Sequence, residues 1–433
     1  MYRAEYPRPN FVREEWLCLN GTWDFSFKGA ESTRIEVPFV FQCPLSGIGD
    51  NRLCDYVTYS RKFKRPPGWE GRRIMLRFGA VDYECRVYVN GKYVGGHIGG
   101  SCGFGFDITD HLTGKEESLR VEVYDPCLDQ NIPRGKQYWK ERPEAIWYTR
   151  STGIWQTVWL EPVPEISIQS LKFTPNVDSG TVEVEYALEG DASGSQLEFS
   201  ITMDDNAVAS ISLGINKNHG KFTVDIFQND ISRSNFHGSG WCWSPKNPRL
   251  FTVNAVLSKN GTAQDRVSSY FGMRKIETRN GRIYLNNRPY TQKLVLDQGY
   301  WPESLMTAPS DEALKQDILL AKEMGFNGCR KHQKSEDPRF LYWADVLGYL
   351  VYVEIPSAVA FNAQSAGASI NEWLEIVARD YNSPSIVAWV TLNESWGVPN
   401  VGIDPQQQDY SLTLYHLLKT LDKTRLVVGN DGW

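Results

Sequence analysis

The sequence has no excess of basic residues, no long apolar run and no apolar N-terminal leader. Lys and Arg total 46 against 52 Asp and Glu, a formal net charge of −6, so nucleic acid and anionic membrane surfaces are not expected partners. No segment approaches the roughly 18 uninterrupted apolar residues that a membrane-spanning helix needs. We expect a soluble, cytoplasmic protein, or a secreted or periplasmic one if a leader is removed.

Metal-type cysteine spacing is also missing. The eight cysteines include no CxxC pair, which argues against a zinc site or a thioredoxin-like redox site. Several lie in strand-like patterns, where a buried free thiol is the ordinary outcome, so we interpret them as reduced. We predict no metal and no cofactor.

The chain is long and rich in aromatic residues. Its 433 residues suggest about three domains, each able to bury a core of its own. Aromatic residues make up 13% of the chain. Aromatic faces pack against the C–H surfaces of sugar rings, but they also fill ordinary cores, so this favours carbohydrate only slightly.

Residues 1–163 are predicted to form an all-β sandwich of the jelly-roll kind. Short alternating segments are separated by turn residues, and Asn90-Gly91 is a strong hairpin signal. The long irregular segment Asp125 to Thr152 carries basic and aromatic residues. It is expected either to reach an active site or to pack against a neighbouring domain, and the sequence favours neither strongly.

Residues 164–277 are predicted to form an immunoglobulin-like β-sandwich. About a hundred residues with roughly seven short strands fit that fold, although the Cys…Trp…Cys signature is absent. After Gly281 the pattern changes to alternating strands and helices. Residues 278–433 are therefore expected to hold five parallel strands, either the first part of a (β/α)8 TIM barrel or an open doubly wound sheet.

The strand at 386–390 is followed directly by Asn393 and Glu394. In barrels of alternating strands and helices the active site forms at the carboxyl ends of the strands, so a carboxylate there is a candidate catalytic group. The alternative is a glutamate that caps a helix or lies solvated in a loop.

Several motifs, taken together and in order, resemble glycoside hydrolase family 2, whose members join a jelly roll, an immunoglobulin-like domain and a catalytic TIM barrel. The resemblance covers essentially the whole chain. The motifs are Arg8-Pro-Asn-Phe-Val-Arg, Leu19-Asn-Gly-Thr-Trp-Asp-Phe, Tyr88-Val-Asn-Gly-Lys, Thr152-Gly-Ile-Trp-Gln-Thr-Val-Trp-Leu-Glu, Phe271-Gly-Met-Arg and Asn393-Glu394.

The resemblance implies a role for each residue of the Asn393-Glu394 pair. Glu394 corresponds to the general acid/base and Asn393 to the residue that binds the sugar 2-hydroxyl. Retaining glycosidases use two carboxylates about 5 to 5.5 Å apart, one of which protonates the leaving oxygen while the other attacks the anomeric carbon. The acid then serves as the base that activates water.

The family's nucleophile, a glutamate after the seventh strand, is expected about 90 residues beyond Glu394, outside this sequence. We therefore expect the 433-residue chain to be an incomplete, inactive fragment of its barrel. Glu354, after the third strand, is a weaker candidate for the nucleophile, and a supporting or salt-bridge role is favoured for it.

Further substrate-binding residues are implied by the same resemblance. Arg330 and His332 match an arginine and a histidine of the family's sugar subsite; a barrel salt bridge and a satisfied loop histidine are the alternatives. Asp297 stands where the family often has a histidine, and it would recognise hydroxyls as an acceptor. Trp301 and Trp396 are candidate stacking faces, with core packing an equal alternative.

The chain is thus predicted to act on carbohydrate as a retaining exo-β-glycosidase of the β-galactosidase type. β-Glucuronidase and β-mannosidase specificities stay open, as does a non-catalytic carbohydrate-binding protein. An open edge on the strand at 426–428 would also favour self-association into a homo-oligomer.

Overall fold

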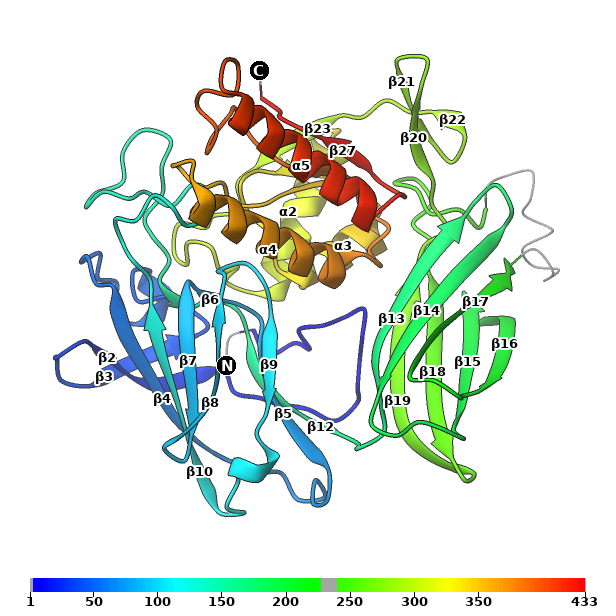
Figure 1. Cartoon of the computed structure of the whole chain (residues 1–433), viewed down its shortest axis with the longest axis horizontal. Coiled ribbons are helices and arrows are strands. Elements are labelled where there is room, and N and C mark those ends of the chain that lie inside the picture. Colours follow the sequence, from blue (N-terminus) through cyan, green and yellow to red (C-terminus); the bar gives the residue numbers. More distant parts are fainter. Residues whose placement is uncertain (1–2, 227–239, 433) are drawn as a thin grey trace.

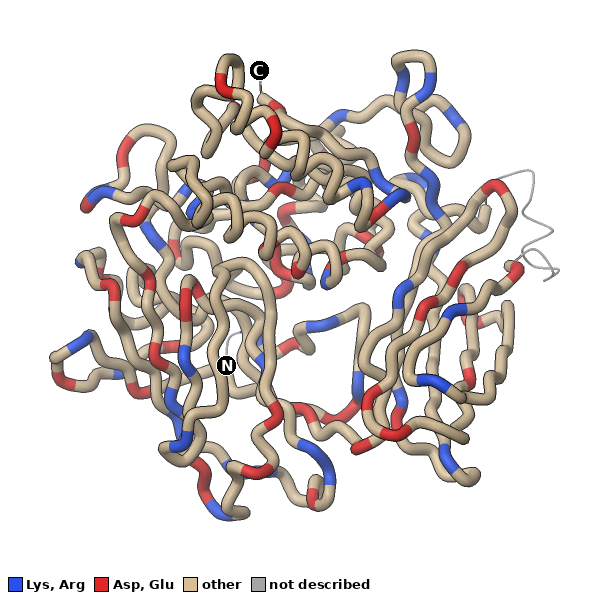
Figure 2. Tube along the Cα trace, viewed as in Figure 1, with Lys and Arg blue, Asp and Glu red and all other residues tan. Residues whose placement is uncertain are grey.

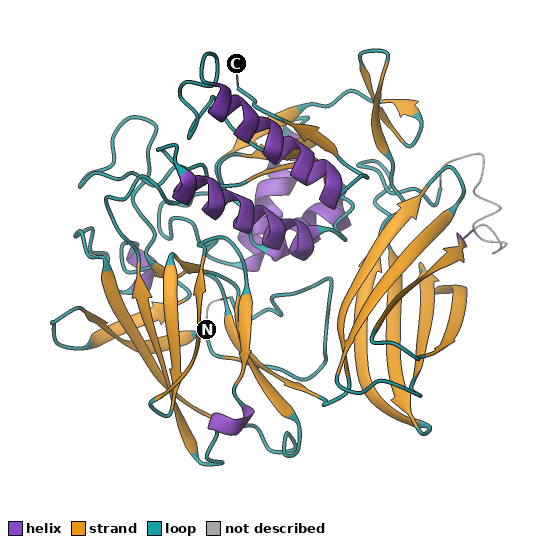
Figure 3. Ribbon diagram, in the orientation of Figure 1, coloured by secondary structure: helices purple, strands orange, loops and turns teal. Residues whose placement is uncertain are grey.

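The structure is a computed structural model that describes residues 3–226 and 240–432. Two β-sandwiches lie side by side, and a third part with a parallel sheet and four long helices lies across them (Figure 1). The long helices α2 to α5 all belong to the third part (Figure 3).

The first sandwich consists of two main antiparallel sheets. Strand pairing follows the order β1-β12-β5-β9 in one sheet and β3-β2-β4-β10-β7-β8 in the other, with a small β11-β6 pair. The elements are β1 (Leu17–Cys18), β2 (Gly21–Phe27), β3 (Thr33–Val37), η1 (Pro44–Ser46), β4 (Tyr56–Lys64), β5 (Arg73–Phe78), β6 (Val81–Asp82), β7 (Glu84–Val89), β8 (Lys92–Ile98), β9 (Phe104–Asp107), η2 (Thr109–His111), β10 (Glu116–Tyr124), β11 (Gly153–Ile154) and β12 (Val158–Val163).

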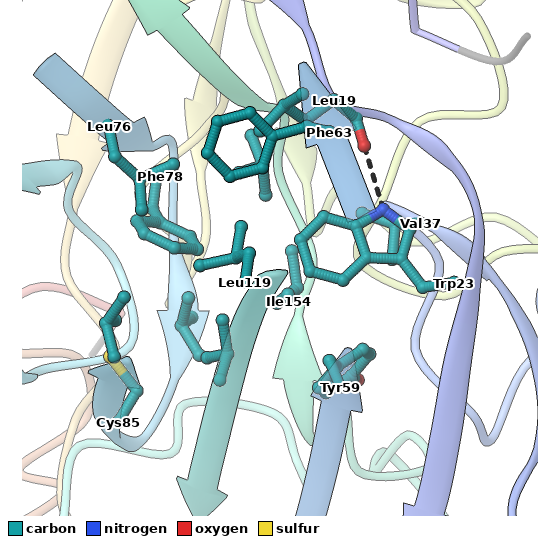
Figure 4. Close-up of a cluster of buried hydrophobic side chains, with 14 of the residues drawn as sticks. Leu19, Trp23, Val37, Tyr59, Phe63, Leu76, Phe78, Cys85, Leu119 and Ile154 are labelled. Atoms are coloured by element: carbon teal, nitrogen blue, oxygen red, sulfur yellow. Dashed lines mark hydrogen bonds between the residues drawn. The ribbon is translucent and has the colours of Figure 1, made fainter. Parts of the chain in front are cut away.

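Alternating side chains from the two sheets form the core of this sandwich. Strand β10 shows the pattern clearly, since Leu119, Val121 and Val123 are buried and the residues between them are not. Trp23 is fully buried and donates its indole N–H to the carbonyl oxygen of Leu19 at 2.8 Å (Figure 4). The ring therefore fills the core without leaving a polar atom unpaired.

The second sandwich pairs a three-stranded sheet, β13-β14-β17, with a four-stranded sheet, β16-β15-β18-β19. Its strands are β13 (Ser167–Asn176), β14 (Thr181–Glu189), β15 (Gln196–Met203), β16 (Asn206–Gly214), β17 (His219–Asp225), β18 (Phe251–Lys259) and β19 (Thr262–Phe271). The sequence pattern did not single out β16 and β19. Most side chains of β16 are exposed or half-buried, so its apolar alternation is weak.

The third part begins with a protruding hairpin and continues as a parallel α/β unit. The hairpin strands are β20 (Ile276–Arg279), β21 (Arg282–Leu285) and β22 (Arg288–Pro289). The parallel sheet has the order β23-β24-β25-β26-β27. Its elements are β23 (Leu294–Asp297), α2 (Asp311–Glu323), β24 (Gly328–Lys331), α3 (Pro338–Leu347), β25 (Leu350–Glu354), α4 (Ala363–Asp380), β26 (Ile386–Val390), α5 (Pro405–Leu421) and β27 (Leu426–Val428).

Local sequence signals explain where these helices begin. Ser310 caps α2 by accepting the backbone N–H of Ala313, and Asn362 forms a capping box with Ser365 at the start of α4. Proline occupies the first position of α3 and α5, where its missing N–H costs nothing.

The segment before β1 joins all three parts. The backbone of Val12 pairs with Ser268 of the second sandwich, and Arg13 binds Asp265 at 2.8 Å. Arg3 binds Asp337 of the third part, also at 2.8 Å. These buried contacts hold the sandwiches in fixed positions against the parallel sheet.

Charges of both signs are interspersed along all three parts of the chain (Figure 2). None of the helices among the described residues is both long and apolar enough to cross a bilayer. Within residues 3–226 and 240–432, no three His, Cys, Asp or Glu side chains are grouped as metal ligands would be.

Candidate active site

Polar residues follow four neighbouring strands of the parallel sheet at the ends where those strands finish. Arg330 lies in β24, Glu354 ends β25, Asn393 follows β26 and Asp431 follows β27. Because the strands are parallel, these ends lie at one edge of the sheet, where barrel enzymes build their active sites.

Arg330 connects these strand ends. Its Nε and Nη2 atoms lie 2.8 Å from Oε2 of Glu354, its Nη2 donates to Oδ1 of Asn393 at 2.7 Å, and its Nη1 lies 2.8 Å from Oδ2 of Asp431. Glu354 is completely buried, and Asn393 is 1% exposed. The planar guanidinium therefore fixes three acceptor side chains from three strands.

Three buried polar atoms around Arg330 have no hydrogen-bond partner among the described residues. They are Oε1 of Glu354, Nδ1 of His332 and Nδ2 of Asn393. The His332 and Glu354 atoms are 3.5 Å apart, close but outside good hydrogen-bond distance. Unpaired donors and acceptors at a strand-end cluster are suited to bind the hydroxyl groups of a ligand.

The backbone presents Glu394 to solvent. Glu394 and Ser395 both have positive φ values, 47° and 58°, which non-glycine residues seldom adopt. The Glu394 N–H donates to the carbonyl oxygen of Asp431 at 2.7 Å, and Asn430 holds Ser395 from the loop after β27. A Cβ at position 432 would lie 2.8 Å from Cγ of Glu394. The glycine at this position therefore leaves space for the Glu394 side chain.

Asp297 does not join this cluster. Its Oδ2 lies 2.8 Å from Nζ of Lys331, which also binds Glu336 at 2.9 Å. Lys331 follows Arg330 directly in β24, and consecutive strand residues point to opposite faces. Asp297 therefore pairs on the helix-covered face, away from Arg330 and Glu354.

A second buried ion cluster extends from this pair. Burial alone would raise the pKa of Glu336, but the charges of Lys331 and Lys334 lower it to about 2. Lys334 also donates to the carbonyl oxygens of Gly299 and Met306 at 2.6 and 2.7 Å. The network ties the loop after β23 to the loop after β24, which indicates a structural role for these groups.

The two candidate tryptophans lie in different surroundings. Trp301 packs on the third-part core, with Nζ of Lys334 5.2 Å from its ring centroid. Trp396 lies two residues after Glu394, and its ring centroid is 5.1 Å from that of Trp147. Trp396 thus flanks Glu394, whereas Trp301 supports the buried ion cluster.

The segment from Asp125 to Thr152 packs against the third part and also lies close to the strand-end cluster. It packs against the third part, since the N–H groups of Arg134 and Gly135 both donate to the carbonyl oxygen of Ser357 at 3.1 Å. It also reaches the strand-end cluster, because the ring centroid of Trp147 lies 5.1 Å from that of Trp396, two residues after Glu394.

Sequence reasoning missed Asp431 and the buried ion cluster. Asp431 carries the same signal as Glu394, a carboxylate just after a parallel strand. Glu336 and Lys334 lie in an irregular segment after β24, and no periodic pattern marks them.

The chain joins two β-sandwiches to a parallel α/β unit whose strands end in polar residues. Three family models match the chain in succession: glycosyl hydrolases family 2, sugar binding domain, at residues 44–160; glycosyl hydrolases family 2 at 166–274; and glycosyl hydrolases family 2, TIM barrel domain, at 276–432. The chain belongs to glycoside hydrolase family 2, with the predicted fold class of jelly roll, immunoglobulin-like domain and partial barrel.

Relatives of known name carry different activities. The chain is 26% identical over 397 residues to a beta-galactosidase of Thermoanaerobacter pseudethanolicus, covering 88% of this chain and 51% of that protein. It is 24% identical over 404 residues to a beta-glucuronidase of Streptococcus agalactiae, covering 85% of this chain and 63% of that protein.

A solved structure of Bifidobacterium dentium beta-glucuronidase shares the fold, with a TM-score of 0.81 at 21% identity over 98% of this chain and 74% of that chain. The chain spans between 41% and 63% of the length of three curated relatives that it matches.

Proposed function

We propose that this chain carries the acid/base half of a retaining exo-β-glycosidase site. Glu394 is the general acid and base, and Asn393 binds the sugar next to the scissile bond. The observation that carries the proposal is the Arg330 cluster: one guanidinium holds Asn393 and Glu354 within 2.8 Å at the carboxyl ends of the strands, directly beside Glu394.

The chemistry suits each residue to its role. Asn393 accepts from Arg330 through Oδ1, so its Nδ2 is left to donate to a sugar hydroxyl. Glu394 is exposed and held by its backbone rather than by a side-chain partner, so its carboxyl group can exchange a proton with the leaving oxygen and then with water. His332 supplies a further polar atom for a hydroxyl, since its Nδ1 has no hydrogen-bond partner among the described residues.

Hydrolysis with retention needs a second carboxylate as nucleophile. Glu354 is unsuited to that role because Arg330 occupies its Oε2 and its side chain is fully buried. The described parallel sheet has five strands, so no described residue follows a seventh strand. We therefore propose that the described residues bind the sugar and supply the acid/base, Glu394. Turnover would then require a further carboxylate outside the described residues.

The sugar proposed is a β-linked hexose or hexuronic acid at a non-reducing end. A β-galactoside is the first expectation from the sequence motifs. The names of the relatives, beta-galactosidase and beta-glucuronidase, support both a neutral and an acidic sugar.

Two measurements on the 433-residue chain test this proposal. Ligand-observed NMR with methyl β-D-glycosides should show binding, and incubation with 4-nitrophenyl β-D-glycosides should release no nitrophenol. Turnover that is abolished by Glu354→Gln would overturn the assignment, because Glu354 would then be the nucleophile. Absence of any glycoside binding would overturn the proposed site itself.

A further inference from the structure

Four cationic side chains lie near the carboxyl ends of β23 to β26. Three of them form ion pairs with carboxylates, and the fourth, Lys136, forms none with the described residues. Arg330 binds Glu354, Lys331 binds Asp297 and Glu336, and Lys334 binds Glu336, all within 3.0 Å. Lys136, which the first sandwich contributes, has no carboxylate within ion-pair distance and no hydrogen-bond acceptor for its ammonium among the described residues. Yet Lys136 is only 4% exposed.

The position of Lys136 is fixed by the backbone on both sides. Gly135 has a φ of 56°, and a Cβ there would lie 2.3 Å from the carbonyl oxygen of Gln333. Tyr148 donates its N–H to the carbonyl oxygen of Lys136 at 2.9 Å. These two contacts hold the backbone of Lys136 at the end of the sheet.

The side chain of Lys136 points toward the proposed sugar site. Its Nζ lies 5.3 Å from the ring centroid of Trp147, which packs edge-on against Trp396. Burial lowers the pKa of the Lys136 ammonium, and the negative charges of Glu394 and Glu354 partly offset that shift. The ammonium is thus within electrostatic range of both carboxylates and forms an ion pair with neither.

An ammonium without a partner in the protein can bind a ligand, and an anion pairs with it more strongly than a neutral hydroxyl does. We propose that Lys136 is a specificity-determining residue that binds a carboxylate of the substrate, so that the first sandwich selects a β-linked hexuronic acid over the matching neutral hexose. This inference rests on the proposed glycosidase site and adds a residue from another domain to it.

The test compares pairs of sugars that differ only at C6. Dissociation constants of methyl β-D-glucuronide and methyl β-D-glucoside, and of methyl β-D-galacturonide and methyl β-D-galactoside, are measured by ligand-observed NMR. In the wild-type chain at least one uronide should bind more tightly than its neutral partner by about tenfold or more. Added NaCl should weaken uronide binding more than binding of the neutral sugar.

Lys136→Met should remove the preference for the uronide and leave the affinity for the neutral glycoside within about twofold. Lys136→Arg should keep part of the preference. Lys140→Met is the matched control, because Lys140 belongs to the same segment and its side chain is 62% exposed. Lys140→Met should bind both sugars as the wild-type chain does. Urea unfolding of each variant checks the fold, and Lys136→Gln replaces the methionine variant if that variant does not fold.

The outcomes separate the two proposals. Equal binding of uronide and neutral sugar by the wild-type chain, or a preference that survives in Lys136→Met, overturns the role of Lys136 and leaves the glycosidase site standing. No binding of any of the four glycosides overturns the glycosidase site and the role of Lys136 with it.

Discussion

Arg330 and Glu354 form a buried ion pair at the carboxyl ends of adjacent parallel strands, with Nη2 and Oε2 2.8 Å apart and Glu354 fully buried. The pair connects fold and function, because the same guanidinium holds the Asn393 oxygen and so aims its amide N–H groups. A residue that fixes two others in this way supports binding geometry as well as stability.

Removal of Arg330 should therefore destabilise the chain strongly. Arg330→Met leaves the Glu354 carboxylate buried and unpaired, which costs about 3 kcal/mol of unfolding free energy. Lys62→Met is the control, since the Lys62–Glu116 pair lies on the surface with side chains 73% and 48% exposed. That substitution should cost less than about 1 kcal/mol. Equal effects of the two variants in urea denaturation would show that the Arg330–Glu354 pair is not structurally important.

Stability should also depend on pH through Glu372 in α4. Burial raises the pKa of Glu372 from 4.5 to about 7, so the folded state binds this proton more tightly than the unfolded state. Its stabilising contribution is complete below about pH 4.5 and is lost as pH rises through 7.

Glu372→Gln should remove that dependence. At pH 8 the variant should be more stable than the wild-type chain by on the order of 2 kcal/mol, with a much smaller difference at pH 5. Glu323→Gln, at an exposed position of α2, should leave the pH profile unchanged. A Glu372→Gln profile parallel to that of the wild-type chain would contradict the prediction.

Docking of the sandwich segment on the sheet should depend on Gly135. Gly135→Ala combines a left-handed φ with a clash against the Gln333 carbonyl oxygen, while Gly114→Ala has a φ of 76° and no atom within 4 Å of its Cβ. Gly114→Ala should cost about 1 kcal/mol for the backbone alone, and Gly135→Ala clearly more.

Hydrogen exchange gives the second readout for Gly135→Ala. The N–H groups of Val359 and Ala360, which donate to the carbonyl oxygen of Gln130, should exchange faster in Gly135→Ala and at the wild-type rate in Gly114→Ala. Unchanged exchange in both variants would mean that the segment stays docked without Gly135.

Self-association is expected from the edge of the parallel sheet. In the described part of the chain β27 pairs only with β26 and β23 only with β24, and Leu296, Leu320 and Met324 nearby are 55%, 53% and 71% exposed. The mass from light scattering should rise with concentration, and Met324→Lys with Leu320→Lys should reduce that rise. A monomeric mass at all concentrations would rule out this association.

Much of this organisation is readable from local sequence signals. The strand expected at 426–428 is β27. Ser310 caps α2, and Pro338 and Pro405 are the first residues of α3 and α5; such caps and first-turn prolines are readable because they act within a few residues. Strand β16 escaped prediction because most of its side chains stay exposed or half-buried.

The site was predictable only in part, for a physical reason. Polar residues after parallel strands converge, which brings Arg330 and Asn393 together. The same rule does not say which face of the strand a side chain occupies, and Asp297 pairs with Lys331 on the other face. Lys136 comes from a segment about 260 residues away from Glu394 in sequence, and only tertiary packing places the two near each other.

The most direct test of the central claim is the affinity of the chain for a methyl β-D-glycoside, measured by ligand-observed NMR in the wild type, Asn393→Ala and Asn400→Ala. The wild-type chain and Asn400→Ala, altered at an exposed position in the same loop, should bind equally. Asn393→Ala should bind about tenfold more weakly, because the sugar loses a buried hydrogen bond. Equal affinity in all three proteins would contradict a sugar site built around Asn393, Glu394 and Arg330.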